Sequence, residues 1–143
     1  MRPYMPFILA VLAACTTQGS ETASHSARFP AYPSDLFSAF EQTCIDPAQT
    51  FSRPTRHSRE CREYMDPETT AAVILKYDGT TEDLPRLVFR FTAQPDEKEY
   101  LVTFDAFVNV PQKSGGPVHV VFVDPAVDRH LASMFRTVGG VPE

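Results

Sequence analysis

Four arginines spaced every third residue have the clearest potential for chemistry in this sequence. Arg53, Arg56, Arg59 and Arg62 lie in the segment SRPTRHSRECRE, together with His57. Guanidinium groups bind phosphate and carboxylate groups through paired hydrogen bonds. A period of three aligns side chains on an extended polyproline-like ridge or on a tight helix. The spacing therefore predicts an anion-binding ridge over residues 53–62.

A second interpretation of these arginines needs no ligand. They are followed or flanked by acidic residues of the same chain, namely Asp46, Glu60, Glu63 and Asp66. Pairing with these acids would neutralise the guanidinium groups and keep the segment soluble. The sequence leaves both interpretations open.

The remaining histidines and acids do not form a recognisable catalytic or metal site. His119 lies between valines in a predicted strand, and His130 lies two residues after Asp128, which places the two on different faces of a helix. The neighbouring arginines disfavour a metal ion at His57. The sequence also contains no nucleophile motif of the Gly-x-Ser-x-Gly or Ser-x-x-Lys type. We therefore expect a non-enzymatic protein without a metal or cofactor, with an enzyme that uses an unrecognised site as an alternative.

Composition limits the classes of protein to consider. The chain has 143 residues, a formal net charge of −5 and 43% hydrophobic residues. This length suits a single globular domain. The acidic balance disfavours nucleic acid as a partner. After residue 15 no apolar stretch is long enough to span a membrane.

The amino-terminal residues have the three-part pattern of a secretory signal. Arg2 supplies a positive charge, residues 7–12 are apolar, and Ala13 and Ala14 are small. Cys15 follows at the expected cleavage boundary. The sequence Leu12-Ala13-Ala14-Cys15 resembles the lipobox of bacterial lipoproteins, and the resemblance covers only this leader. The alternative is an ordinary secreted protein with a coincidental cysteine.

The resemblance implies a location for the protein. In bacterial lipoproteins a signal peptidase removes the leader, here residues 1–14, and the new terminal cysteine, here Cys15, carries the lipid anchor. Several acyl chains anchor a protein stably in a membrane. Thr16 differs from the aspartate that favours retention at the inner membrane in such proteins. The resemblance therefore implies the cell envelope, at the periplasmic face of the outer membrane.

Lipidation of Cys15 would leave an even number of cysteines. Cys44 and Cys61 would then be the two remaining thiols in an oxidising compartment, where disulfides persist. We expect them to form a disulfide that closes the loop of residues 45–60. Two free buried thiols, or half of a metal site, are the alternatives.

The mature chain is predicted to consist of a tether and one domain. Residues 15–33 are polar, rich in serine and threonine, and contain two prolines near their end, which predicts a flexible tether with a solvated His25. The predicted domain spans residues 34–143. Ser34 can cap a helix that reaches Cys44, and Asp124-Pro125 can start a final helix that ends before Gly139.

Strands are predicted between these two helices. Residues 86–93 and 99–110 alternate apolar and polar side chains, and residues 117–124 form a third strand. Asp66-Pro67 starts another helix, but residues 70–77 fit a helix or a strand, and we favour a short helix that runs into a strand. The prediction is an α+β two-layer sandwich. It has an antiparallel meander of three or four strands, packed by an N-terminal and a C-terminal helix, and one disulfide.

These observations predict a small membrane-anchored envelope lipoprotein that binds another molecule or serves as an accessory subunit of an envelope assembly. Its expected partners are the membrane, through Cys15, and an envelope protein or an anionic envelope component. Anion binding by residues 53–62 is the alternative, with lipid headgroups or the phosphates of lipopolysaccharide as ligands.

Overall fold

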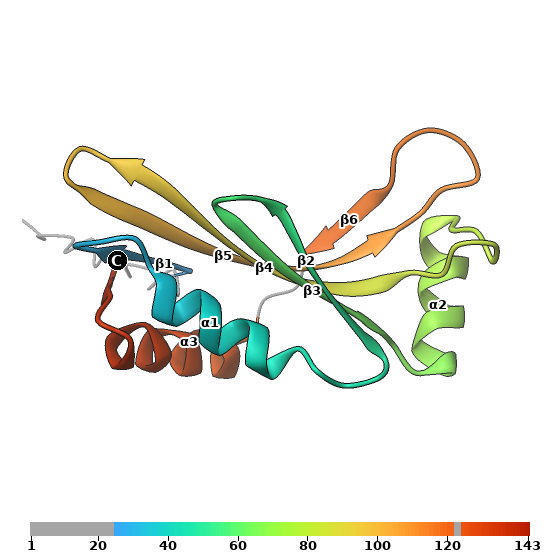
Figure 1. The fold of residues 1–143 in the computed structure, drawn as a ribbon. Coiled ribbons are helices and arrows are strands. Elements are labelled where there is room, and N and C mark those ends of the chain that lie inside the picture. The colour runs from blue at the N-terminus through green and yellow to red at the C-terminus, as the bar shows by residue number, and fades with distance from the viewer. Residues whose placement is uncertain (1–24, 122–123) are drawn as a thin grey trace, which may run out of the picture.

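The fold belongs to the α+β class, as predicted, and contains three helices and a seven-stranded antiparallel sheet in the described residues (Figure 1). The computed structural model describes residues 25–121 and 124–143. The helices are α1 (Ser34–Thr43), α2 (Pro67–Tyr77) and α3 (Pro125–Thr137). The strands are β1 (Ser26–Phe29), β2 (Gln49–Thr55), β3 (Ser58–Tyr64), β4 (Arg86–Asp96), β5 (Glu99–Val110), β6 (Val118–Val121) and β7 (Val141–Pro142).

Strand β5 organises the sheet because it pairs with three other strands. The strand order is β2-β3-β4-β5-β1-β7, and β6 also pairs with β5. On the side of β5 away from β4, β1 pairs with residues 100–103 and β6 pairs with residues 107–110. A short stretch of β5 therefore lies between the ends of β1 and β6.

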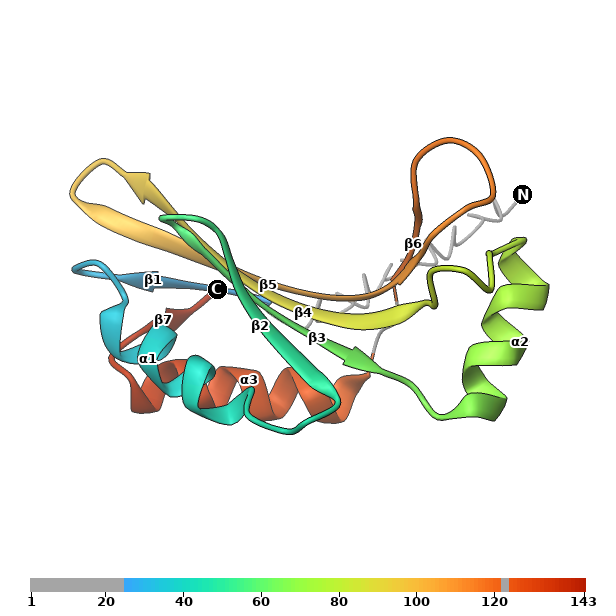
Figure 2. The ribbon, with the colours of Figure 1, turned by 45° about the vertical axis from the view of Figure 1, so that its right-hand side comes forward.

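The main core lies between the sheet and the helices α1 and α3. Both helices run along the same face of the sheet. Helix α2 lies apart from them, at the end of the sheet where the β5–β6 hairpin lies (Figures 1 and 2). Leu36 and Phe37 of α1 and Leu131 and Phe135 of α3 are buried against apolar strand residues. These strand residues are Ala27, Phe29, Phe91, Ala93, Val102 and Phe104.

The helix starts follow the capping chemistry in the sequence. The carboxylate of Asp124 accepts a hydrogen bond from the Ala126 amide at 2.8 Å, and that of Asp66 accepts one from Thr69 at 2.9 Å. Residues 70–77 are helical, so the favoured transition to a strand within them is wrong. Helix α1 has the predicted range, but Ser34 is its first residue and makes no capping hydrogen bond.

Two further predictions about local structure are wrong. The segment around the arginines forms the hairpin β2–β3 instead of a loop or ridge, which raises the number of strands above the predicted three or four. The predicted tether also extends too far, since residues 26–29 form β1 and bury Ala27 and Phe29 in the core. The folded domain therefore begins before the predicted boundary at residue 34. Residues 15–24 of the predicted tether lie outside the described residues.

The predicted disulfide is present. Cys44 follows the last residue of α1, and Cys61 lies in β3, with their Cα atoms 5.9 Å apart. The bond therefore joins the end of α1 to the hairpin that contains the arginines.

Candidate functional site

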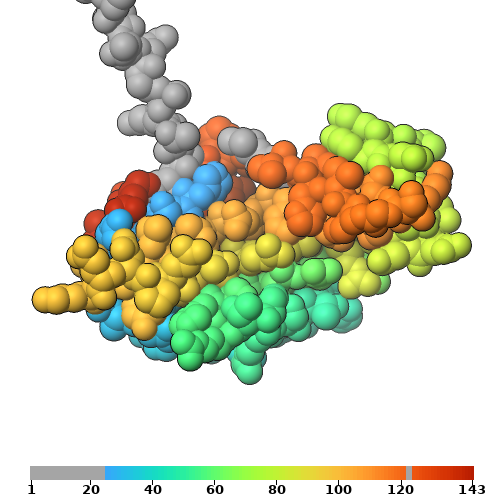
Figure 3. All heavy atoms as spheres, turned by 90° about the horizontal axis from the view of Figure 1, so that it is seen from above, coloured from blue at the N-terminus to red at the C-terminus, as the bar shows by residue number. Residues whose placement is uncertain are grey.

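The sheet has one face that none of the three described helices covers (Figures 1 and 2). The cross-strand pair Phe91 and Phe104 points to the helices, so the neighbouring pair Arg90 and Asp105 points to the opposite face. We call this second surface the open face. The strands that carry it make up most of the surface visible in Figure 3. Its central residues are Ser58, Glu60, Arg62, Arg86, Val88, Arg90, Thr92, Thr103, Asp105, Phe107, Asn109, His119 and Val121.

Glu60 lies at the centre of a charged network on the open face. Its side chain is only 1% exposed, whereas Arg62 and Arg90 are 38% and 33% exposed. Arg62 donates a hydrogen bond from Nε to one carboxylate oxygen of Glu60. Arg90 donates to the other oxygen from Nε at 2.8 Å, and its Nη2 lies 2.7 Å away. The buried carboxylate thus holds two guanidinium groups from neighbouring strands.

The two arginines keep Glu60 ionised. Burial alone would raise the pKa of Glu60, but the hydrogen bonds and positive charges of Arg62 and Arg90 outweigh this effect and hold the pKa below its ordinary value. A lowered pKa in the folded state means that the ionised carboxylate stabilises the fold above the ordinary glutamate pKa of about 4.3. This contribution is lost as the pH falls below that value towards the pKa of the folded state.

We predict that Glu60→Gln lowers the free energy of unfolding by about 1–3 kcal/mol at pH 7, because it removes a buried carboxylate from two guanidinium groups that are still partly solvated. The difference from wild type should shrink as the pH falls below about 4.3. Urea unfolding, followed by circular dichroism at a series of pH values, measures both effects. Glu82→Gln at an exposed loop position is the matched control. A pH-independent difference between wild type and Glu60→Gln would contradict the account.

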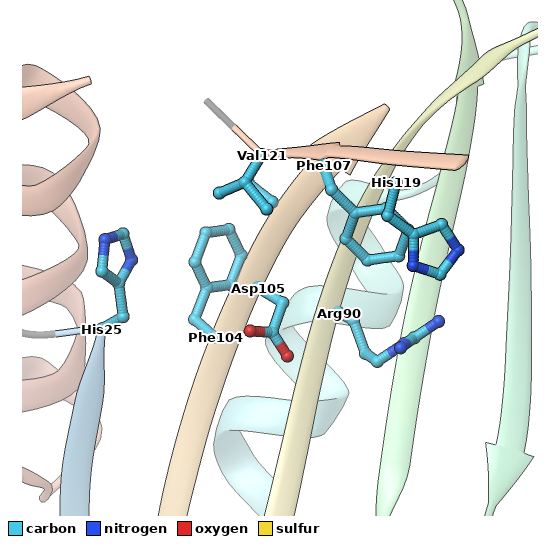
Figure 4. Close-up of a pocket in the computed structure, with 8 residues that line it drawn as sticks. His25, Arg90, Phe104, Asp105, Phe107, His119 and Val121 are labelled. Atoms are coloured by element: carbon cyan, nitrogen blue, oxygen red, sulfur yellow. The ribbon is translucent and has the colours of Figure 1, made fainter. Parts of the chain in front are cut away.

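A hollow of about 340 Å³ adjoins this network, where β5 runs between the ends of β1 and β6. Arg90, Asp105 and His119 contribute polar groups to its lining. The imidazole of His119 lies over Phe107, with ring centroids 4.5 Å apart. Figure 4 shows the guanidinium of Arg90 turned away from Asp105. The hollow therefore combines an aromatic wall with charged groups at its rim, which is typical of a ligand site.

His25 borders the same hollow, although the sequence predicted a solvated side chain in a tether. Its Nε2 atom lies 3.2 Å from Oδ1 of Asp128, whose side chain is 4% exposed. The distance fits an ion pair, but neither carboxylate oxygen has a hydrogen-bond partner among the described residues. The backbone oxygen of His25 accepts a hydrogen bond from the Phe104 amide at 2.7 Å, which extends the pairing of β1 with β5. His25 is therefore part of the folded domain.

The predicted arginine ridge does not exist, because strand geometry sends its members in different directions. Arg53 pairs with Glu41 of α1 at 2.6 Å. Arg59 lies over the ring of Phe37 at 4.6 Å, on the side of the sheet that the helices cover. Of the four arginines, only Arg62 belongs to the network around Glu60.

The other two members of the predicted ridge lie at the tip of the β2–β3 hairpin. Arg56 donates a hydrogen bond from Nε to Nε2 of His57 at 2.8 Å. The backbone oxygen of Arg56 accepts a hydrogen bond from the hydroxyl of Tyr32 at 2.6 Å. The tip is thus attached to the segment between β1 and α1. The pairing of Arg62 with Glu60 agrees with the second interpretation of the arginines, in which they pair with acids of the same chain.

The residue patterns did not indicate Arg86, Arg90 or Asp105 as site residues. The signal was available for Arg90, because the alternation in β4 puts Val88, Arg90 and Thr92 on the face opposite the buried phenylalanines. The contact of Arg90 with Glu60 depends on the pairing of β3 with β4, which residue patterns do not show.

Cys15, the predicted lipid-anchor position, lies outside the described residues. Within residues 25–121 and 124–143, no helix has the length and apolar character needed to cross a bilayer. The same part of the chain holds no group of three or more histidine, cysteine, aspartate or glutamate residues that could bind a metal ion. The chain has no significant match to a protein-family model, to a curated protein or to a solved structure.

Proposed function

We propose that this chain is a small, lipid-anchored, non-enzymatic accessory protein of a bacterial cell envelope that binds a partner through its open face. The observation that carries the binding role is the buried Glu60 with Arg62 and Arg90 above it. A carboxylate that is 1% exposed and shared by two guanidinium groups fixes these groups at a surface that no described helix covers. Fixed polar groups bind a partner at a lower entropic cost than mobile ones.

Two features support the envelope location. The leader ends in the lipobox-like sequence Leu12-Ala13-Ala14-Cys15, which would place a lipid on Cys15. The disulfide between Cys44 and Cys61 suits an oxidising compartment such as the bacterial periplasm. With Cys15 at the periplasmic face of the outer membrane, the domain would lie where envelope proteins and anionic envelope components are accessible.

Metabolic labelling tests the anchor. The full chain, expressed with its leader in a Gram-negative host, should incorporate an alkyne-tagged fatty acid and fractionate with membranes. Cys15→Ser should lose both the label and the membrane association, while retaining the disulfide between Cys44 and Cys61. An unlabelled wild-type protein would overturn the proposed location.

Site-specific crosslinking in intact cells tests the binding surface. A photo-reactive amino acid at Thr92, on the open face, should give a discrete crosslinked product. The same residue at Ser133, on the exposed side of α3, provides the matched control and should give none. The triple variant Glu60→Gln/Arg62→Gln/Arg90→Gln, called the three-amide variant below, should abolish the product at Thr92. A product that forms equally from Ser133, or that persists in the three-amide variant, would contradict binding through the open face.

A further inference from the structure

Three arginines lie next to one another on the open face. Arg62 of β3 is directly opposite Val88 of β4, and Arg86 and Arg90 flank Val88 on the same face. Diagonal neighbours of this kind in an antiparallel sheet are about 7–8 Å apart. The side chain of Arg62 therefore lies beside those of both Arg86 and Arg90, and Glu60 brings the guanidinium groups of Arg62 and Arg90 to one carboxylate.

Each of these arginines is held by a carboxylate or an aromatic ring. Glu60 holds Arg62 and Arg90, and the guanidinium of Arg90 also lies 5.1 Å from the ring centre of Phe107. Arg86 lies over the ring of Tyr64 at 4.5 Å and donates a hydrogen bond to its hydroxyl at 2.8 Å. Aromatic and carboxylate partners together restrict the side-chain motion that a ligand would otherwise have to arrest.

The network leaves hydrogen-bond donors unused. Glu60 occupies Nε of Arg62, and Nε and Nη2 of Arg90. In the described part of the chain, no hydrogen bond involves either Nη atom of Arg62 or the Nη1 atom of Arg90. These donors belong to side chains that are about a third exposed to solvent.

The local charge favours an anion. Three guanidinium groups face two carboxylates, the buried Glu60 and the exposed Asp105, in a chain whose formal net charge is −5. Asp105 lies directly across from Arg90, yet its carboxylate forms no ion pair with Arg90 among the described residues, and Figure 4 shows the two groups diverging. The open face therefore carries an excess of positive charge at this point.

We propose that Arg62, Arg86 and Arg90 form a binding site for a phosphate group on a small or protruding molecule. This inference rests on the proposed function and names the chemistry of its ligand. A carboxylate is satisfied by the fork of one arginine, whereas a phosphate has three terminal oxygens and about two negative charges, which suit several guanidinium groups together. Figure 2 shows the backbone of the sheet rising on this side towards the β4–β5 turn and the β5–β6 hairpin, a shape that favours a protruding group over a flat bilayer.

Titration of the isotope-labelled domain with inorganic phosphate, followed by NMR, tests the site. Amide and arginine Nε signals of β3 and β4 should shift in a saturable manner, with a dissociation constant in the millimolar range that rises with added sodium chloride. Acetate and phosphatidylglycerol vesicles are titrated in the same way for comparison. Weaker binding of acetate and no binding of vesicles are expected. Tighter binding of acetate, or binding of the vesicles alone, would overturn the proposal.

Variants distinguish phosphate binding at this site from binding that depends only on the overall positive charge. The three-amide variant should bind phosphate at least about tenfold more weakly, because it loses two charge-assisted hydrogen-bond forks. Arg129→Gln/Arg136→Gln, which removes two exposed positive charges from α3, should bind as wild type does. Arg62→Lys/Arg90→Lys keeps the charge and should still bind more weakly than wild type. Equal binding by the lysine variant, or equal loss in the α3 variant, would contradict the assignment.

Two controls keep the outcome interpretable. Arg86→Gln leaves the contacts of Glu60 intact, so reduced phosphate binding in this variant cannot arise from disruption of that network. The amide spectrum of each variant reports whether the domain is folded. If phosphate does not bind but the crosslink at Thr92 forms, the ligand assignment is wrong and the binding role of the open face stands. If the crosslink also fails, both are wrong.

Discussion

Phe135→Ala is expected to lower the free energy of unfolding by about 3–5 kcal/mol, because it leaves a cavity in the centre of the main core. The side chain of Phe135 is 0% exposed. Its ring makes edge contacts with Phe29 and Phe91, at centroid distances of 6.1 and 6.0 Å. Phe135 therefore joins α3 to two strands of the sheet, and urea unfolding followed by circular dichroism measures the loss.

The control for this prediction lies on the same helix. Ser133→Ala changes an exposed residue of α3 and should alter stability by no more than about 0.5 kcal/mol. If Phe135→Ala is as stable as Ser133→Ala, then α3 does not pack on the sheet as described.

Removal of the disulfide is expected to have the second large effect. Cys44 and Cys61 are 17 residues apart, and closing a loop of this size stabilises a fold by about 3 kcal/mol on the chain-entropy model. The double variant Cys44→Ala/Cys61→Ala should therefore unfold at a clearly lower urea concentration than the oxidised wild type. Since the bond joins α1 to β3, hydrogen exchange should increase most at the end of α1 and in the β2–β3 hairpin.

A reducing agent supplies the control for the disulfide. It should destabilise the wild-type domain and leave the double alanine variant unchanged. Cys15→Ser should behave as wild type in this assay, because it retains both disulfide cysteines. Equal stability of the oxidised and reduced wild-type proteins would contradict the stabilising role of the bond.

Sequence patterns predicted the elements that bury a regular apolar face or carry a capping signal. Strands β4 and β5 each have one face of mostly apolar residues, and α3 starts at Asp124-Pro125 and buries Leu131 and Phe135. In these segments the local pattern and the tertiary contacts favour the same structure.

The elements that the sequence did not predict lack such a pattern. The hairpin β2–β3 has polar or charged residues on both faces, so its strands depend on pairing with β4. Strand β1 is only four residues long and follows a segment rich in serine and threonine. Residues 70–77 include the β-branched Val73 and Ile74, yet they continue the helix that Asp66 caps. Tertiary context decided the two strand segments, whereas the cap at Asp66 and the mostly exposed position of α2 allowed residues 70–77 to remain helical.

The sequence indicated only one of the arginines in the candidate site. Arg62 was among the predicted anion-binding arginines and lies in the network around Glu60, while anion binding itself stays a prediction. The position of the site depends on the register that brings Glu60 of β3 opposite Arg90 of β4. These residues are far apart in the chain. A spacing of three within one segment carries no information about such pairing, because the segment folds into two antiparallel strands.

The most direct test of the account is an NMR measurement of the arginine side chains at neutral pH. If Glu60 fixes Arg62 and Arg90 on the open face, their Nε–Hε groups should give shifted signals that exchange slowly with water. In Glu60→Gln, both the shift and the slow exchange should be lost. Exposed Arg129 and Arg136 should give averaged, rapidly exchanging signals in both proteins. Averaged signals from Arg62 and Arg90 in the wild-type protein would contradict the account.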